Sequence, residues 1–296
     1  MKLGGARDTV SVAYGALWIS PWAIGFLVFL FVPALLSLYY SFTDYSLLET
    51  PVWVGLANFN ELLGDSMFRI AVRNTLYFAL ASVLLSTLVS LGVASLLERR
   101  LRGVGFIRAV VFLPTLAPVI SACVCWGWLF NSKLGLFNGV LGRLGIPGPD
   151  WLGDKRLAMP SFIFMSLWTI GSAMVIYSAA LKGVPRSLYE AADLDGATGL
   201  RRYMNVTLPM ISPAVLFNGV VSLIWSLQIF APPQVITKGG PENSTLVYQM
   251  YVYSNAFVYG RMGYACALAW IQLLVTLGLT LVVLGLSRRF VYYRAA

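Results

Sequence analysis

Six long stretches of this sequence contain no aspartate, glutamate, lysine or arginine, and they limit the fold more than any other feature. They cover residues 9–43, 74–97, 109–132, 157–181, 203–237 and 262–287. Each supplies the roughly 20 apolar residues that a helix needs to cross about 30 Å of hydrocarbon. A backbone inside a bilayer must satisfy its own hydrogen bonds, and strand-like alternation is absent. The sequence therefore predicts an all-α polytopic membrane protein with six transmembrane helices, at about residues 16–42, 74–97, 109–131, 158–181, 211–236 and 264–287.

The loops between these stretches indicate the orientation of the chain. If the N-terminus is cytoplasmic, 13 of the 21 basic residues fall on the cytoplasmic side: Lys2, Arg7, Arg99, Arg100, Arg102, Arg108, Lys182, Arg186, Arg201, Arg202, Arg288, Arg289 and Arg294. The positive-inside rule then predicts that both termini are cytoplasmic. This placement accounts for the net charge of +9, so we expect contact with the lipid bilayer and no nucleic-acid partner.

Several kinds of chemistry are missing from the sequence. It contains no histidine, and the six stretches hold no acidic or basic side chain. Metal centres, serine hydrolases and ion-coupled carriers depend on such groups, so we expect no metal site and no catalytic residue. A phosphate-binding loop of the form G-x4-G-K-[ST] is also absent, which means that the chain is not expected to bind ATP itself. If it moves a solute uphill, the energy must come from another subunit.

Neutral polar and aromatic side chains are grouped in the fourth and fifth stretches. Hydroxyls, amides and indoles without charge suit an uncharged solute rich in hydroxyl groups, such as a sugar. The alternative is that serine, threonine and asparagine hold the helices together. The residues of this group are Trp168, Thr169, Ser172, Tyr177, Asn218, Ser222, Trp225, Ser226 and Gln228.

The segment between the fourth and fifth spans, residues 182–210, is polar and strongly patterned. Ser187 and Glu190 have the S-x-x-E spacing of a capping box, which predicts that a helix starts there. The helix is expected to end at Gly196, and a second short helix is expected to begin at Thr198 and to stop before Pro209. Three nearby acids (Glu190, Asp193 and Asp195) disfavour a helix resting on anionic lipid. We therefore predict a cytoplasmic element that docks onto a protein partner.

The same segment closely resembles the EAA motif of ABC-importer permeases. The matching residues are Glu190, Ala191, Ala192, Asp195, Gly196, Ala197, Tyr203, Val206, Leu208, Pro209 and Pro213. The stretches "SFTDYS", "VGLANFNELL", "RNTLYFAL" and "TKGGPENST" extend the resemblance to the carbohydrate-uptake branch, of maltose and glycerol-phosphate type. Tyr203 and Val206 replace the more common phenylalanine and isoleucine of the motif.

This resemblance implies a type I ABC-importer permease (MetI-like) fold, with one permease domain over residues 1–296 and its core at about 70–287. It implies import of a sugar or a related polyol such as glycerol phosphate, across the bacterial or archaeal cytoplasmic (inner) membrane. The implied partners are a second permease, two copies of an ATPase subunit that bind ATP and Mg²⁺, and an extracytoplasmic solute-binding protein. The chain would carry no cofactor and would not be an enzyme.

The resemblance also assigns roles to residues. Those expected to couple to the ATPase are Glu190, Ala191, Ala192, Asp195, Gly196, Leu208 and Pro209. Those expected to line the substrate pathway are Trp168, Ser172, Trp225, Ser226 and Gln228. Two alternatives remain open: the same architecture importing a non-sugar solute, or an ion-coupled secondary carrier.

Overall fold

A computed structural model describes residues 5–98 and 102–292. Four of the basic residues predicted to be cytoplasmic lie outside the described residues: Lys2 and Arg294 near the two ends of the chain, and Arg99 and Arg100 after the second predicted span. The chain divides into two compact units, which are described separately. One comprises Met1–Gly64 and Val252–Gln272, and the other comprises Asp65–Tyr251 and Leu273–Ala296.

The first unit begins with a long apolar rod of three helical segments. These are α1 (Gly5–Phe26), the π-helical η1 (Leu27–Phe31) and α2 (Val32–Ser41). A short antiparallel pair follows, β1 (Thr43–Asp44) with β2 (Val52–Trp53), and then α3 (Ala57–Gly64). The unit also takes the end of α13 (Tyr248–Tyr253), the π-helical η6 (Ser254–Val258) and the first turns of α14 (Met262–Phe290).

Polar contacts join the sequence-distant parts of this first unit. The Asn58 side-chain amide donates to the carbonyl groups of Ser41 and Thr43, both at 2.9 Å. Arg261 forms an ion pair with Glu61 at 2.5 Å, and the Gly263 amide donates to the Tyr45 carbonyl. These contacts fix the loop after α2 against the start of α14.

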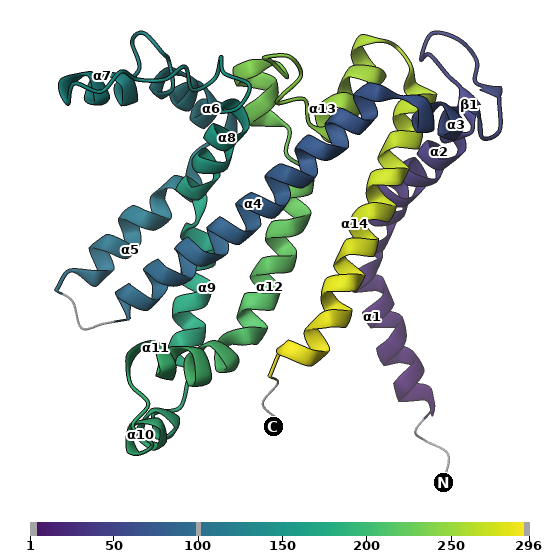
Figure 1. The fold of residues 1–296 in the computed structure, drawn as a ribbon. Helices are drawn as coiled ribbons and strands as arrows, with labels where there is room; N and C mark the ends of the chain where they lie inside the picture. The colour runs from purple at the N-terminus through teal and green to yellow at the C-terminus, as the bar shows by residue number, and fades with distance from the viewer. Residues whose placement is uncertain (1–4, 99–101, 293–296) are drawn as a thin grey trace. The chain divides into compact units, whose positions relative to one another are not determined.

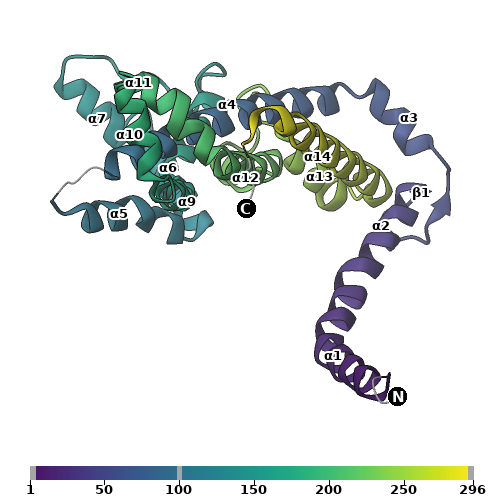
Figure 2. The same cartoon turned by 90° about the horizontal axis from the view of Figure 1, so that it is seen from below.

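The second unit contains most of the remaining helices (Figures 1 and 2). In chain order they are α4 (Ser66–Leu97), α5 (Val104–Phe112), the 3₁₀ segment η2 (Leu113–Leu116), α6 (Val119–Leu129), α7 (Leu136–Arg143), α8 (Ala158–Ser166), the 3₁₀ segment η3 (Leu167–Thr169), α9 (Gly171–Lys182), α10 (Arg186–Leu194), α11 (Gly199–Arg202), the π-helical η4 (Tyr203–Thr207), α12 (Leu208–Leu227) and the π-helical η5 (Pro233–Thr237). The start of α13 and most of α14 complete it.

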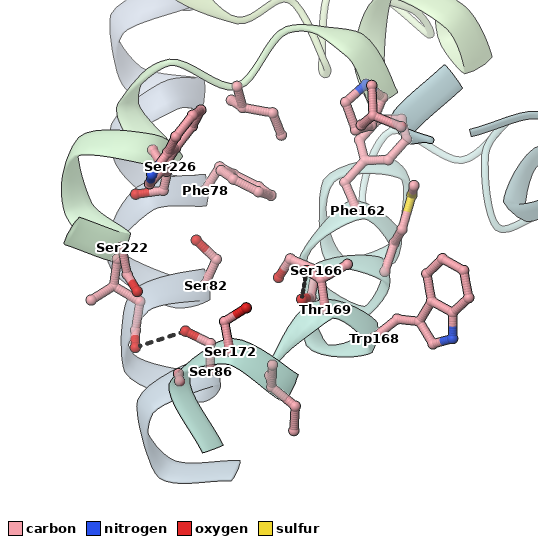
Figure 3. Close-up of a pocket in the computed structure, with 18 of the residues that line it drawn as sticks. Phe78, Ser82, Ser86, Phe162, Ser166, Trp168, Thr169, Ser172, Ser222 and Ser226 are labelled. Carbon is pink, nitrogen blue, oxygen red and sulfur yellow. Dashed lines mark hydrogen bonds between the residues drawn. The ribbon is translucent and has the colours of Figure 1, made fainter. Parts of the chain in front are cut away.

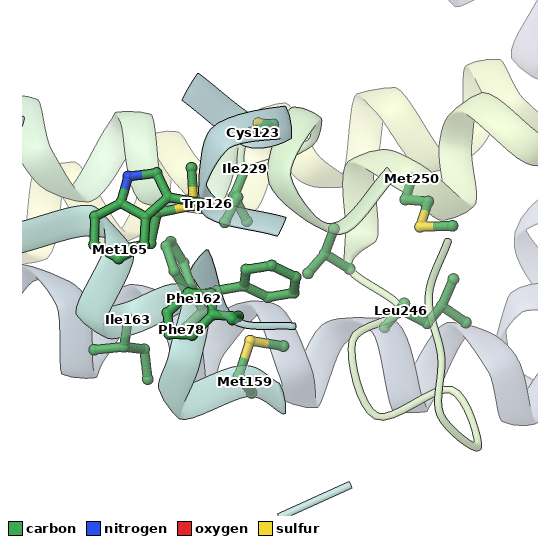
Figure 4. Close-up of a cluster of buried hydrophobic side chains, with 13 residues drawn as sticks. Phe78, Cys123, Trp126, Met159, Phe162, Ile163, Met165, Ile229, Leu246 and Met250 are labelled. Atoms are coloured by element: carbon green, nitrogen blue, oxygen red, sulfur yellow. The ribbon is translucent and has the colours of Figure 1, made fainter. Parts of the chain in front are cut away.

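Helices α4, α9 and α12 pack against one another at the centre of this second unit. Seen from below, α9 and α12 are nearly end-on, with α10 and α11 beside them (Figure 2). A cluster around Phe78, Trp126 and Phe162 fills the half of the unit near α6 and α8 (Figure 4). A second cluster, around Met174, Tyr177 and Ile211, fills the half near α10. Close van der Waals packing of these side chains, rather than their removal from water, holds the helices of a membrane bundle together.

Four helices of the described chain are long and apolar enough to cross a membrane: Leu17–Ser41, Ser66–Leu97, Gly199–Leu227 and Met262–Ser287. Two bent pairs also qualify together, Val104–Leu116 with Val119–Leu129 at 102°, and Ala158–Thr169 with Gly171–Lys182 at 50°. Up to six spans result if each bent pair is one span. The predicted third and fourth spans are therefore broken instead of straight.

Local chemistry explains where the third span breaks. Pro118 has no amide hydrogen and disfavours helical geometry at the residue before it. Ala117 accordingly takes an extended conformation with ψ of 134° between η2 and α6. The fifth span also differs from its predicted limits of 211–236, because its helix starts at Gly199 and ends at Leu227.

Candidate functional site

The first candidate site is the segment around α10, whose glycine-capped end is confirmed. Gly196 has a φ of +70°, in the left-handed region. Its amide donates to the Asp193 carbonyl at 3.1 Å, and the Ala197 amide donates to the Ala192 carbonyl at 2.8 Å. This pair of bonds is the Schellman motif, which satisfies the last carbonyl groups of a helix. Glycine takes this conformation without the steric cost that a side chain would add.

The predicted capping box at the start of α10 is wrong. Pro185 occupies the N-cap position with no side-chain cap hydrogen bond, and the helix begins at Arg186. Ser187 therefore lies inside the first turn, too late to cap it. A proline with extended ψ ends the preceding turn and sets the helix start earlier than the serine pattern suggested.

The second short helix of the segment was predicted to stop before Pro209, and this prediction is wrong. The helix continues into the fifth span. It passes from α11 through the π-helical turn η4 into α12. A π-turn has room for the carbonyl groups that a following proline cannot bond. At Pro213 the freed carbonyl is satisfied in another way, because the Ser212 hydroxyl donates to the Pro209 carbonyl at 2.6 Å. Such local bonding is how membrane helices tolerate proline.

Helix α10 is attached to the bundle by one of its sides. The Tyr189 and Thr207 hydroxyls are hydrogen-bonded at 3.1 Å. Arg202 forms an ion pair with Asp193 at 2.6 Å, and its guanidinium lies over the Tyr189 ring. Ala192 is buried, with 7% of its surface exposed. These contacts hold α10 at a defined angle against η4.

The opposite side of α10 is exposed. It presents Glu190, Ala191 and Asp195, together with Leu194, which is 91% exposed. Among the described residues, Glu190 has no ion-pair partner. The two alanines of the motif thus face different ways, one into the chain and one outward. Of the other residues predicted to couple, Gly196 is exposed and Leu208 and Pro209 are half-buried.

The second candidate site is a cavity of about 660 Å³ among α4, the two broken spans and α12 (Figure 3). All five residues predicted to line a pathway lie in its wall: Trp168, Ser172, Trp225, Ser226 and Gln228. Among the residues that the structure describes, no acidic or basic side chain lines it. The wall combines serine, threonine, asparagine and glutamine with the rings of Phe78, Phe162 and Phe230.

Both broken spans place their breaks at this cavity. Pro114, Ala117 and Val119 come from the first break, and Ser166, Trp168, Thr169 and Ile170 come from the second. Irregular backbone inside a membrane protein is tolerated where it lines a cavity. The two broken spans meet at Gly171, the first residue of α9, where an added Cβ would lie 2.7 Å from Phe112 Cα and 2.7 Å from the Val111 carbonyl oxygen at the end of α5.

The polar groups of the cavity differ in what they can offer a ligand. The Ser226 hydroxyl donates to the Leu223 carbonyl at 3.0 Å, and the Asn218 amide donates to the Ala214 carbonyl at 3.2 Å. Within the described part of the chain, the side chains of Ser172, Ser222 and Gln228 have no hydrogen-bond partner. These three side chains can therefore both donate hydrogen bonds to a ligand and accept them from it. The Ser226 oxygen can only accept, because its hydrogen is already used.

Sequence reasoning missed the contribution of α4 to this cavity. Ser82 and Ser86 line it, although they lie in the second span, far from the residues predicted. Their spacing of four residues puts them on one face of the helix, and Ser90 continues the same row. The regular spacing of these serines is the feature of the sequence that could have indicated this side of the cavity.

Comparison with known proteins agrees with this architecture. The profile of the family "Binding-protein-dependent transport system inner membrane component" matches residues 104–293. The chain is 35% identical over 286 residues to the probable ABC transporter permease protein YesP of Bacillus subtilis, covering 95% of this chain and 92% of that protein. It is 34% identical over 267 residues to the diacetylchitobiose uptake system permease protein NgcF of Streptomyces coelicolor, covering 85% of this chain and 76% of that protein.

A solved structure shares the fold. It is a chain of a bacterial alginate ABC transporter in complex with an alginate pentasaccharide-bound periplasmic protein. The superposition has a TM-score of 0.82, with 23% identity and full coverage of both chains. The chain described here therefore belongs to the family of binding-protein-dependent transport system inner membrane components, as a multi-pass ABC-importer permease.

Proposed function

We propose that this permease forms part of the import pathway for an uncharged sugar. The observation that carries the proposal is the cavity of about 660 Å³, which is lined by hydroxyls, amides and aromatic rings and, within residues 5–98 and 102–292, by no charged side chain. Neutral hydrogen-bonding groups match sugar hydroxyls, and ring faces match the apolar faces of a pyranose. The name of one relative, a diacetylchitobiose uptake permease, is consistent with this class of substrate.

The wall of the cavity also distinguishes neutral sugars from phosphorylated polyols. A phosphate dianion entering a site of low dielectric constant needs arginine, lysine or a helix N-terminus to offset its desolvation. Among the described residues the wall contributes neither lysine nor arginine, and the groups left to meet a phosphate are the starts of α6 and α9 at the two breaks. A helix N-terminus carries only about half a positive charge, against a phosphate charge of nearly −2. We therefore place glycerol phosphate second to a neutral mono- or oligosaccharide as the substrate.

The exposed side of α10 supports a further part of the proposal, the coupling to a separate ATPase. An acid, Glu190, stands beside the exposed Leu194 on a helix whose other side is held to the bundle. A surface of this kind fits a partner groove that carries a basic residue. The proposed assembly comprises this chain, a second permease, two ATPase subunits that bind ATP and Mg²⁺, and an extracytoplasmic binding protein. We propose the inner membrane as its location.

Uptake by the reconstituted transporter tests the substrate class. Proteoliposomes with the complete complex and ATP inside should accumulate a radiolabelled neutral oligosaccharide when its binding protein is present outside. Competition by unlabelled neutral sugars should reduce this uptake, whereas glycerol 3-phosphate should not. Accumulation of glycerol phosphate alone, or of an amino acid, would contradict the proposal.

Gln228→Ala should raise the sugar concentration needed for half-maximal uptake. The side chain offers hydrogen bonds that are not used within the described chain, and each bond to a neutral group contributes about 0.5–1.5 kcal/mol, or roughly 2- to 10-fold in concentration. Basal ATP hydrolysis should remain. The control is Ser226→Ala, which should shift the concentration less because that hydroxyl already donates to Leu223. Loss of basal ATP hydrolysis in Gln228→Ala would instead place this residue in a gate.

Gly196→Val should weaken co-purification of the ATPase with the permease. A β-branched residue at φ of +70° is strained by at least about 1–2 kcal/mol, so the end of α10 would rearrange. Gly196→Asn is the matched control, because asparagine tolerates the left-handed region. Equal ATPase recovery with both variants would contradict a role for this turn in assembly.

A further inference from the structure

Helix α7, between the two broken spans, presents an apolar strip on one side. Leu136, Val140 and Leu144 are 53%, 49% and 69% exposed. They are spaced by four residues, which places them in a row along one side of a helix. The exposed Gly142, two residues after Val140, lies on the opposite side of the helix. The helix therefore presents an exposed apolar strip in one direction and a position without a side chain in the opposite direction.

The orientation of this strip is fixed by contacts within the second unit. Phe137 packs against Phe130 with ring centroids 5.2 Å apart. The Asn138 amide donates to the carbonyl groups of Ser132 and Pro149, both at 2.9 Å, and its oxygen accepts from the Trp151 indole at 2.8 Å. Because the contacts of Phe137 and Asn138 hold α7 in place, the apolar strip keeps a constant direction relative to α6 and α8.

The position of α7 matches the surface of a bilayer. It connects Leu129 to Ala158, the ends of two candidate spans, and lies at the opposite end of its unit from α10, crosswise to α9 and α12 (Figure 1). Trp128, at the end of α6, is 58% exposed, as is common for tryptophan at a membrane interface. Two exposed cations, Lys133 and Arg143, flank the strip.

We propose that α7 is an interfacial helix that rests on the bilayer surface at this end of the permease. Leu136, Val140 and Leu144 lie among the upper acyl chains, and Lys133 and Arg143 contact the phosphates of anionic lipids. The physical basis is the combination of an apolar strip that enters the lipid and flanking basic residues, which holds amphipathic helices at interfaces. A docking surface for a soluble protein would not require both cations beside an apolar row.

The test uses the complete transporter in nanodiscs that contain phosphatidylglycerol, in a background where the exposed native Cys125 is replaced by alanine. An environment-sensitive fluorophore is attached at Leu144→Cys or, as the matched control, at Gly142→Cys, where an added Cβ meets no atom within 4 Å. The label at 144 should lose most of its emission to lipids spin-labelled near the headgroup and should be protected from aqueous iodide. The label at 142 should show the reverse.

Three other results would overturn the interfacial helix. Iodide quenching of both labels would place the strip in water, and protection of the label at 144 from both quenchers would show that protein covers it. A label at 144 that becomes protected only when the solute-binding protein is added would assign the strip to that protein.

The contribution of the two cations is tested in the same nanodiscs. Spin-labelled phosphatidylglycerol should quench the label at 144 more than spin-labelled phosphatidylcholine does. The difference should be lost in the Lys133→Gln, Arg143→Gln double variant. If it persists, the anionic-lipid contact is refuted while the apolar contact stands.

Discussion

Glu190→Lys is expected to abolish sugar uptake while the permease still inserts and folds. Glu190 is exposed on α10 and has no ion-pair partner among the described residues, so its replacement removes no contact that holds the helix. On the proposed ATPase surface, a lysine would face a basic residue that an acid had neutralised. Like charges brought together at an interface cost on the order of several kcal/mol, which is roughly a 100-fold or greater loss of affinity.

The measurement is binding-protein-dependent uptake and ATP hydrolysis in proteoliposomes. Glu190→Gln should give an intermediate loss, because it removes the attraction without adding repulsion. Glu242→Lys is the matched charge reversal away from α10; its bond to Lys155 is solvent-exposed and contributes little, so uptake should persist. Uptake at the normal rate by Glu190→Lys would falsify the coupling role of this residue.

Gly171→Ala is expected to give the largest loss of stability. The added methyl would lie 2.7 Å from the Phe112 Cα and from the Val111 carbonyl oxygen, and backbone atoms cannot rotate away as a flexible side chain can. The two broken spans must therefore separate where they meet beside the cavity. Overpacking of this kind costs about 1–3 kcal/mol, and the cavity wall is expected to shift with it.

Thermal unfolding of the detergent-solubilised complex measures this effect. The matched control is Gly92→Ala in α4, where an added Cβ meets no atom within 4 Å. Alanine there should stabilise the helix by about 0.5–1 kcal/mol, since glycine is the poorer helix former. Equal unfolding temperatures for the two variants would show that the spans do not meet closely at Gly171.

The membrane class and the motif of α10 were predictable because both signals are local in the chain. Hydropathy is summed over about 20 consecutive residues, so the stretches of the spans can be read without knowing their neighbours. The glycine that ends α10 was predictable for a related reason, since a Schellman motif involves only six consecutive residues. The start of the same helix was predicted wrongly, because Pro185 competed with the serine pattern two residues later.

The shape of the spans was less predictable. Hydropathy reports length and composition, and it does not say whether an apolar stretch runs straight. The bend of 102° in the third span depends on Pro118 and on the packing of both halves against the unit. The continuation of α11 into α12 depends on a π-turn and on the Ser212 hydroxyl, which together accommodate Pro209 and Pro213.

The sequence by itself determined that this chain is a bundle of apolar helices with a patterned polar segment before the fifth span. Those properties depend on neighbours in the chain and on fixed spacings. Only the tertiary structure decided which groups enclose the cavity, because helix packing and not sequence proximity brings Ser82 and Ser86 of α4 to the same cavity as Ser222 and Gln228. It also decided that Ala192 faces the bundle while Ala191 and Glu190 face outward, since that depends on the bonds of Tyr189 and Arg202 to neighbouring elements.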